Sequence, residues 1–198
     1  MSQSEYAEAF KTAEQHLKFA ENIIHIADTT GNAEFVSGLL FPAVNELRYS
    51  SRHAIQATES CGENDREDAW KKARDHCFRA SYDAFDAQLQ YIISECAIFQ
   101  NDFRRGVEIS QVISEYQEDC RILNKIKKVN YRQTGKREDH WEDMKKHVDI
   151  LLPILEKWNT ARDELNKILR KELLDRWFKT LGIFGGIAAV IALILKLF

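Results

Sequence analysis

The sequence predicts an all-α protein, a helical bundle followed by a single C-terminal transmembrane helix. Its 198 residues include only 2 Pro and 8 Gly, too few for the closely spaced turns of an all-β sandwich. Apolar residues recur at intervals of three and four, which is the period of an amphipathic helix. The net charge of −3 argues against a basic nucleic-acid coat protein, and the mean hydropathy of −0.43 argues against a polytopic membrane protein.

Five helices are expected before the C-terminal tail. They cover residues 4–27, 42–59, 65–100, 107–129 and 138–179. In the first helix, apolar residues keep helical spacing from Tyr6 to Ala27, and the segment TTGN (29–32) ends it. Pro42 suits the first turn of the second helix, because its fixed φ is helical and its missing N–H is not needed there.

Turn-forming segments separate the later helices. CGEN (61–64) precedes the third helix, and NYRQTG (130–135) precedes the fifth. Inside the fifth helix we expect a kink at Pro153. Its apolar residues from Val148 to Leu169 keep a three–four spacing, which suits packing in the bundle or a short coiled coil between subunits. The chain divides into a bundle (1–137), a long helix that contacts the bundle or another subunit (138–176) and a tail (177–198).

The tail carries the transmembrane prediction. From Leu181 to Leu195 the sequence has no charge and no strongly polar group. Trp177, Lys179 and Lys196 flank this run as interfacial residues do. As a helix, residues 177–198 are about 33 Å long, enough to cross a bilayer. The alternative is a buried C-terminal helix, because the uncharged run alone is short for a span.

Several features predict where the protein resides and how it assembles. The N-terminal residues are charged and amphipathic, without the apolar core of a signal peptide. With basic residues on the body side of the tail, this predicts a single-pass inner-membrane protein with a cytoplasmic body. Gly185 and Gly186 would allow close helix packing in lipid, so we expect a homo-oligomer. The four cysteines form no CxxC pair, so we expect reduced thiols, no metal and no small-molecule cofactor.

The helix expected over 42–59 holds the candidate chemistry. Its predicted buried arc consists of Ala43, Leu47, Ser50, Ala54, Ile55 and Thr58. On the opposite arc Arg48 and Arg52 stand one turn apart, and two planar guanidinium groups favour a phosphate. His53 follows, about 140° from Arg48 around a straight helix, so a site that uses both needs two copies of the helix. The alternative is surface ion pairing of the arginines with Glu46 or Glu59.

An R-x4-H motif on a helix of a small all-α bundle resembles the HEPN superfamily (higher eukaryotes and prokaryotes nucleotide-binding). NELRYSSRH (45–53) resembles the motif region, and HCFRASYDAFD (76–86) more loosely resembles the helix that often follows. The resemblance covers residues 3–129. Many members are dimeric, metal-independent endoribonucleases. Carried over, His53 would act in proton transfer and Arg48 would stabilise the phosphorane charge.

The bundle and tail together resemble the membrane-associated HEPN-like accessory proteins of type VI RNA-targeting CRISPR systems. This resemblance implies a homo-oligomeric accessory or effector of antiviral defence that forms a pore or otherwise perturbs the membrane, with RNA or an RNA-guided nuclease as partner. The alternative is a membrane-anchored, metal-independent HEPN endoribonuclease. A third class is a tail-anchored adaptor without activity. The bulk of Tyr49 beside Arg48, and the second arginine Arg52, favour a non-enzymatic role.

A second cationic region lies between residues 121 and 137, which contain seven basic residues and no acidic one. They are Arg121, Lys125, Lys127, Lys128, Arg132, Lys136 and Arg137. RNA or anionic lipid headgroups would suit such a segment. A solvated loop that pairs with acids of a neighbouring subunit is the alternative. Six of these residues, from Lys125 to Arg137, join Arg52 as candidates for anion or RNA binding.

Overall fold

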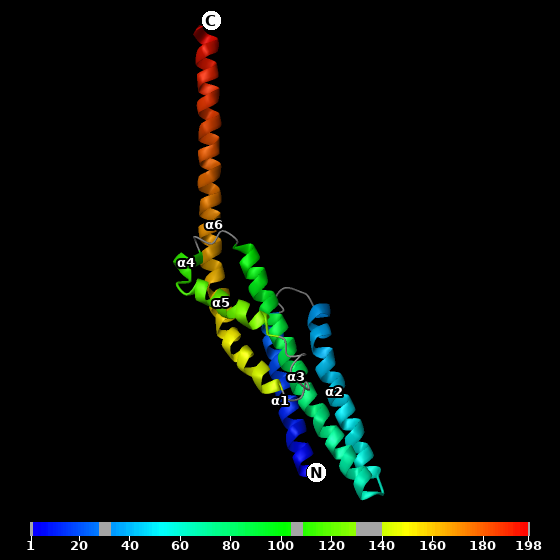
Figure 1. The fold of residues 1–198 in the computed structure, drawn as a ribbon. Helices are drawn as coiled ribbons and strands as arrows, with labels where there is room; N and C mark the ends of the chain where they lie inside the picture. The colour runs from blue at the N-terminus through cyan, green and yellow to red at the C-terminus, as the bar shows by residue number, and fades with distance from the viewer. Residues whose placement is uncertain (1, 28–32, 104–108, 130–139, 198) are drawn as a thin grey trace.

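The computed structural model describes residues 2–27, 33–103, 109–129 and 140–197, without the side chains of 24–27, 33–37, 176 and 182–197. This part of the chain is all-α, which confirms the predicted class. The elements are α1 (Gln3–Ala27), α2 (Ala33–Glu59), α3 (Glu63–Asp102), α4 (Ile109–Val112), α5 (Tyr116–Lys127) and α6 (Trp141–Leu197). Figure 1 shows an elongated bundle from which the C-terminal part of α6 projects alone.

α3 is the central helix of the bundle. It packs against α1, α2 and α6, and buried side chains follow one another along most of its length. Phe85, Ile92 and Phe99 are almost completely removed from solvent. A helix covered on three sides must be apolar over most of its circumference, unlike a surface helix with a single apolar stripe.

α2 begins nine residues before Pro42, so the predicted start of this helix is wrong. A proline inside a helix lacks the N–H donor, and its ring crowds the carbonyl of the residue four positions earlier. That residue is Gly38. Even so, Pro42 stays inside the helix, which continues to Glu59.

The single helix expected over 107–129 is also wrong, because the chain forms α4 and α5 there. α5 begins at Tyr116, and its first turn carries Glu118 and Asp119. Acidic side chains near a helix N-terminus interact favourably with the helix dipole and its free N–H groups. This favours a new helix start at Tyr116 over continuation of the preceding one.

The first part of α6 belongs to the bundle core. Val148, Leu151, Leu155, Trp158 and Leu165 are all buried in the same cluster as the apolar side chains of α3. The three–four spacing of these residues therefore reflects packing within one chain. The helix continues through Pro153 without a break, and its yellow part leans relative to its orange part in Figure 1.

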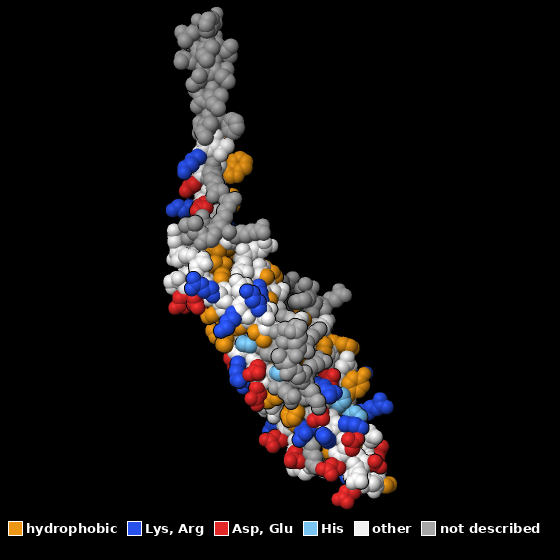
Figure 2. All heavy atoms as spheres, viewed as in Figure 1, with side chains coloured by type: hydrophobic (Ala, Val, Ile, Leu, Met, Phe, Trp, Pro, Cys, Tyr) orange, Lys and Arg blue, Asp and Glu red, His pale blue; other side chains and the backbone are white. Residues whose placement is uncertain are grey.

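Beyond the bundle, α6 exposes large apolar side chains. Leu173, Leu174, Trp177, Phe178 and Leu181 are each between 56% and 70% exposed. Figure 2 shows hydrophobic side chains on one side of this projecting segment and charged ones on the other.

The predicted membrane span is covered only in part by the described residues. No helix within the described residues combines the length and apolarity needed to cross a membrane. The predicted packing and interface residues Gly185, Gly186 and Lys196 lie outside the described side chains, whereas Trp177 and Lys179 are described and exposed.

The most conspicuous polar group in the core is Gln88 on α3. The side chain is fully buried, and neither its amide nitrogen nor its amide oxygen has a hydrogen-bond partner among the residues that the structure describes. Leaving such a group unsatisfied costs roughly 1–3 kcal/mol.

We therefore predict that Gln88→Leu raises the free energy of unfolding by about 1–2 kcal/mol, measured by thermal melting in mild detergent. The exposed neighbour Gln90→Leu is the control, and a loss of stability in Gln88→Leu would contradict the packing described.

Candidate functional site

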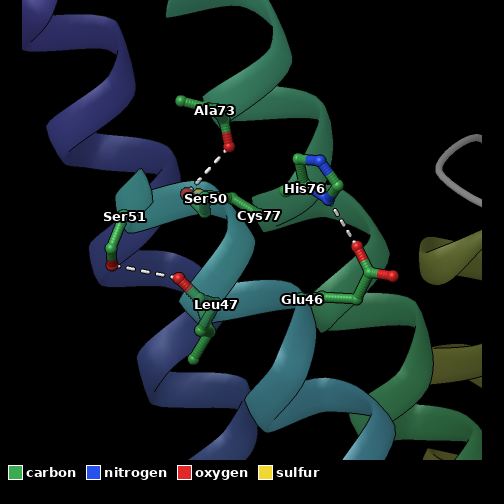
Figure 3. A network of polar contacts seen from close by, with 7 residues as sticks. All are labelled: Glu46, Leu47, Ser50, Ser51, Ala73, His76 and Cys77. Carbon is green, nitrogen blue, oxygen red and sulfur yellow. Dashed lines mark hydrogen bonds and ion pairs between the residues drawn. The ribbon is translucent and has the colours of Figure 1, made fainter. Parts of the chain in front are cut away.

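α2 and α3 form an antiparallel hairpin across a short turn at Ser60–Gly62. A buried polar contact holds the two helices in register. The hydroxyl of Ser50 on α2 donates to the carbonyl oxygen of Ala73 on α3 at 2.8 Å, and the Sγ of Cys77 lies 3.0 Å from the same hydroxyl oxygen (Figure 3). Because the single hydroxyl proton goes to Ala73, the Cys77 thiol is the donor in the second contact.

One helical turn from Ser50, Glu46 faces His76. A carboxylate oxygen of Glu46 lies 2.6 Å from Nδ1 of His76, and both side chains are more than four-fifths buried (Figure 3). A carboxylate can only accept, so His76 donates its Nδ1 proton. This orients the imidazole and leaves Nε2 as the ring nitrogen that can accept or donate a proton elsewhere. No described residue bonds to Nε2.

The two histidines of the hairpin lie against each other. The His53 and His76 rings are stacked, with centroids 5.2 Å apart and planes 14° from parallel. Tyr49 contacts His76 with a centroid distance of 5.7 Å, and the guanidinium of Arg48 lies 5.3 Å from the centre of the Tyr49 ring. These four side chains make a continuous series of ring and cation contacts at the surface between α2 and α3.

The structure places the predicted site residues on α2 as follows. Arg48 and Arg52 are exposed, and no described acidic residue pairs with either. Glu46, one of the expected partners, contacts His76 instead. The arginines are thus available to an anion, which a surface ion pair would have prevented.

The predicted buried arc of α2 is partly wrong. Ile55 is 59% exposed and Thr58 is exposed, whereas Ala57 is completely buried against Ala69 and Trp70 of α3. Near the C-terminal end of α2, the side of the helix that faces the core is therefore displaced from the predicted one toward Ala57. Ile55 therefore extends the exposed surface that carries Arg48 and Arg52.

The hydroxyl and thiol groups of this polar network are poorly suited to act as nucleophiles. Ser50 is buried and bonded to Ala73, and the hydroxyl of Ser51 donates to the carbonyl oxygen of Leu47 at 3.0 Å (Figure 3). Burial raises the pKa of the Cys77 thiol to about 11, so this thiol stays protonated at neutral pH. A reaction that used the imidazoles as acid and base could instead draw its nucleophile from the substrate or from water.

The other predicted site residues lie away from the hairpin. Lys125, Lys127 and Lys128 are exposed at the C-terminal end of α5. Arg132, Lys136 and Arg137 lie outside the described residues. No group of three or more potential ligands that could hold a metal ion occurs in the described ranges.

The sequence analysis did not predict Glu46 and His76 as residues of the site. Both lie in segments that were singled out, but their contact depends on which residues of the two helices face each other. The short turn was a usable signal, because Glu46 is sixteen residues before Gly62 and His76 is fourteen after it. In an antiparallel helical hairpin, positions at similar distances from the turn lie opposite each other.

The Glu46–His76 contact predicts a specific tautomer. When His76 is neutral, its proton should reside on Nδ1, because the carboxylate accepts a hydrogen bond there. Glu46→Ala should reduce the population of this tautomer, measured from the ring ¹⁵N chemical shifts at mildly alkaline pH. Glu59→Ala, at the exposed end of α2, should leave them unchanged. A wild-type His76 protonated on Nε2 would show that the contact does not form.

Comparison with known proteins supplies no relative. No family model, no curated protein and no solved structure matches this chain. The functional conclusions below therefore depend on the geometry of the helices and on the chemistry of their side chains.

Proposed function

We propose that this chain is a HEPN-like, membrane-tethered, homo-oligomeric effector or accessory of prokaryotic antiviral defence of the CRISPR type. The observation that supports it is the course of α6. One unbroken helix is packed in the core over its first part and then leaves the bundle with a large apolar surface exposed. The defence role itself comes from the resemblance of the motif and the tail.

The apolar surface on the projecting helix needs a partner. At about 100° per residue, Leu173, Trp177 and Leu181 fall on one side, with Glu172 and Asp175 opposite. This segment of α6 lies beyond the part that packs in the core, and its large apolar side chains are more than half exposed. Full burial of such side chains is worth roughly 1.5–3 kcal/mol each. A lipid bilayer, with Trp177 and Phe178 near the headgroups, would supply that burial.

Assembly follows from the geometry of a single tail. One helix cannot enclose a pore, so any conductance requires several copies arranged around an axis. Gly185 and Gly186 would allow the tails to approach closely in lipid. Polar residues such as Glu172 and Lys179 on the opposite side of the helix would then remain in water, above the apolar segment. The proposed site of action is the inner membrane, with the bundle in the cytoplasm.

Removal of the tail tests the tether. Deletion of residues 177–198 should move the protein from the membrane fraction to the soluble fraction, because the bundle buries its own core without them. Fractionation with and without an alkaline carbonate wash distinguishes insertion from surface attachment. A full-length chain that stays in solution without detergent would refute the tether.

A metal-independent endoribonuclease is the second candidate, and the His53–His76 stack favours it. The sequence alone required two copies of α2 to bring Arg48 and His53 to one bond. The hairpin instead places two imidazoles within one chain, with one of them oriented by Glu46. In such a reaction the RNA 2′-oxygen attacks phosphorus, one imidazole takes the 2′-hydroxyl proton, and the other protonates the leaving 5′-oxygen.

The ribonuclease candidate predicts a defined pattern of variants. His53→Ala and His76→Ala should each reduce cleavage by ~10²–10⁴-fold, with 2′,3′-cyclic phosphate ends and no effect of EDTA on the wild type. His140→Ala, on the first residue before α6, is the matched control. Purified wild-type protein that leaves RNA intact would remove this candidate while leaving the tether unaffected.

A further inference from the structure

The basic end of α5 forms a cationic surface separate from the α2–α3 hairpin. On α5, Arg121, Lys125 and Lys128 recur at intervals of four and three, so they lie on one face. Leu123 and Ile126 face the core. Lys127 lies on another side of the helix, within electrostatic range of the Cys96 thiol on α3. Burial raises the pKa of this thiol to about 12, and the Lys127 ammonium acts in the opposite direction.

The lysines of this surface are not neutralised by the protein. Lys18, Lys72 and Lys146 each pair with an acid one turn away on their own helix. Lys125, Lys127 and Lys128 have no ion-pair partner among the described residues, and all three are exposed. The acids of α5 lie in its first turn, where Glu118 pairs with Arg121 and Asp119 with Lys157. Three uncompensated cations within four residues will attract an anionic partner.

The position of α5 along α6 decides between RNA and anionic lipid headgroups, the two partners that suit this surface. Asp119 contacts Lys157 at 2.7 Å, and Tyr116 packs against Trp158, so α5 crosses α6 at residues 157–158. Trp177 lies twenty residues farther along the same helix, about 30 Å away. Figure 1 shows α5 against the body of the bundle, with α6 running on beyond it.

Lipid headgroups are too far away to act on these lysines if α6 stands upright in the membrane. The Debye length at physiological salt is about 8 Å, so the potential of an anionic surface falls to a few per cent over about 30 Å. This step rests on the proposed tether, because only an inserted tail fixes the height of the bundle. Basic residues closer to Trp177, such as Lys171 and Lys179, are the ones within reach of headgroups.

We infer that the exposed basic end of α5, formed by Arg121, Lys125, Lys127 and Lys128, binds the phosphate backbone of single-stranded RNA. The contact is electrostatic and independent of base sequence. Cys96 of α3, whose thiol is within electrostatic range of Lys127, is twenty residues and about 30 Å beyond His76 along the helix. The basic end of α5 is therefore a separate binding surface that works whether or not the hairpin cleaves RNA.

The test is binding of a fluorescein-labelled oligouridine to the full chain in mild detergent over a range of salt concentrations. Lys125→Gln, Lys127→Gln and Lys128→Gln together should lower the slope of log affinity against log salt by about 2, since each neutralised single-strand phosphate contributes about 0.7. The control replaces Lys11, Lys18 and Lys71, exposed lysines of α1 and α3, by Gln with the same change in net charge. It should keep the wild-type slope.

A second arm separates RNA from lipid. Binding to phosphatidylcholine vesicles with and without phosphatidylserine should be unchanged in the α5 triple variant, whereas Lys171→Gln with Lys179→Gln should lose the preference for phosphatidylserine. An α5 variant with unchanged RNA affinity and slope overturns the inference. So does loss of the phosphatidylserine preference in the α5 variant. If the full chain binds no vesicle at all, the tether fails, and the RNA arm still decides the role of α5.

Discussion

The buried indole of Trp158 is the contact on which the arrangement of this molecule depends. Its ring packs between Phe99 of α3 and Tyr116 of α5, with centroid distances of 5.0 Å to each. Its N–H donates to the buried carboxylate of Asp119 at 3.0 Å. Lys157, the residue before Trp158 on α6, pairs with the same carboxylate. A buried charge is tolerated only when it is paired and hydrogen-bonded in this way.

This network connects α3, α5 and α6. It fixes α6 against α3 and α5, so the direction in which the projecting segment leaves the bundle is set by the core. It also fixes the distance along α6 between the basic end of α5 and the projecting segment. At the other end of α3, the Ser50–Ala73 contact fixes the register in which Glu46 meets His76. α3 is therefore the common support for the α2–α3 site, the α5 surface and the tail.

The fold class was predictable because it depends on quantities that are local in sequence. The scarcity of proline and glycine and the three–four spacing of apolar residues indicate helices wherever they lie in space. Boundaries were harder to predict. Pro42 suited a helix start, yet α2 begins nine residues earlier and holds this proline in its interior. Ile55 was assigned to the core, but it is exposed, and Ala57 packs against α3 in its place.

The candidate site was predictable in part. Arg48, Arg52 and His53 could be named because they are neighbours on one helix. The contact of Glu46 with His76 could not be named without the register of α2 against α3, which depends on packing between helices and on a turn of only a few residues. Likewise, the segment 121–137 was visible as a charged stretch, but its distance from the tail depends on where α5 crosses α6.

The most direct test of the central claim is a nitroxide accessibility scan along α6 in phospholipid vesicles. Single spin labels placed from residue 163 to residue 195, in a background without the native cysteines, report collision with oxygen and with a water-soluble nickel chelate. If α6 carries the body on a tail in the bilayer, nickel access should be high up to about residue 175 and low beyond Leu181, while oxygen access rises around the whole helix. Nickel access that persists to residue 195, or protection on one side of the helix only, would contradict insertion.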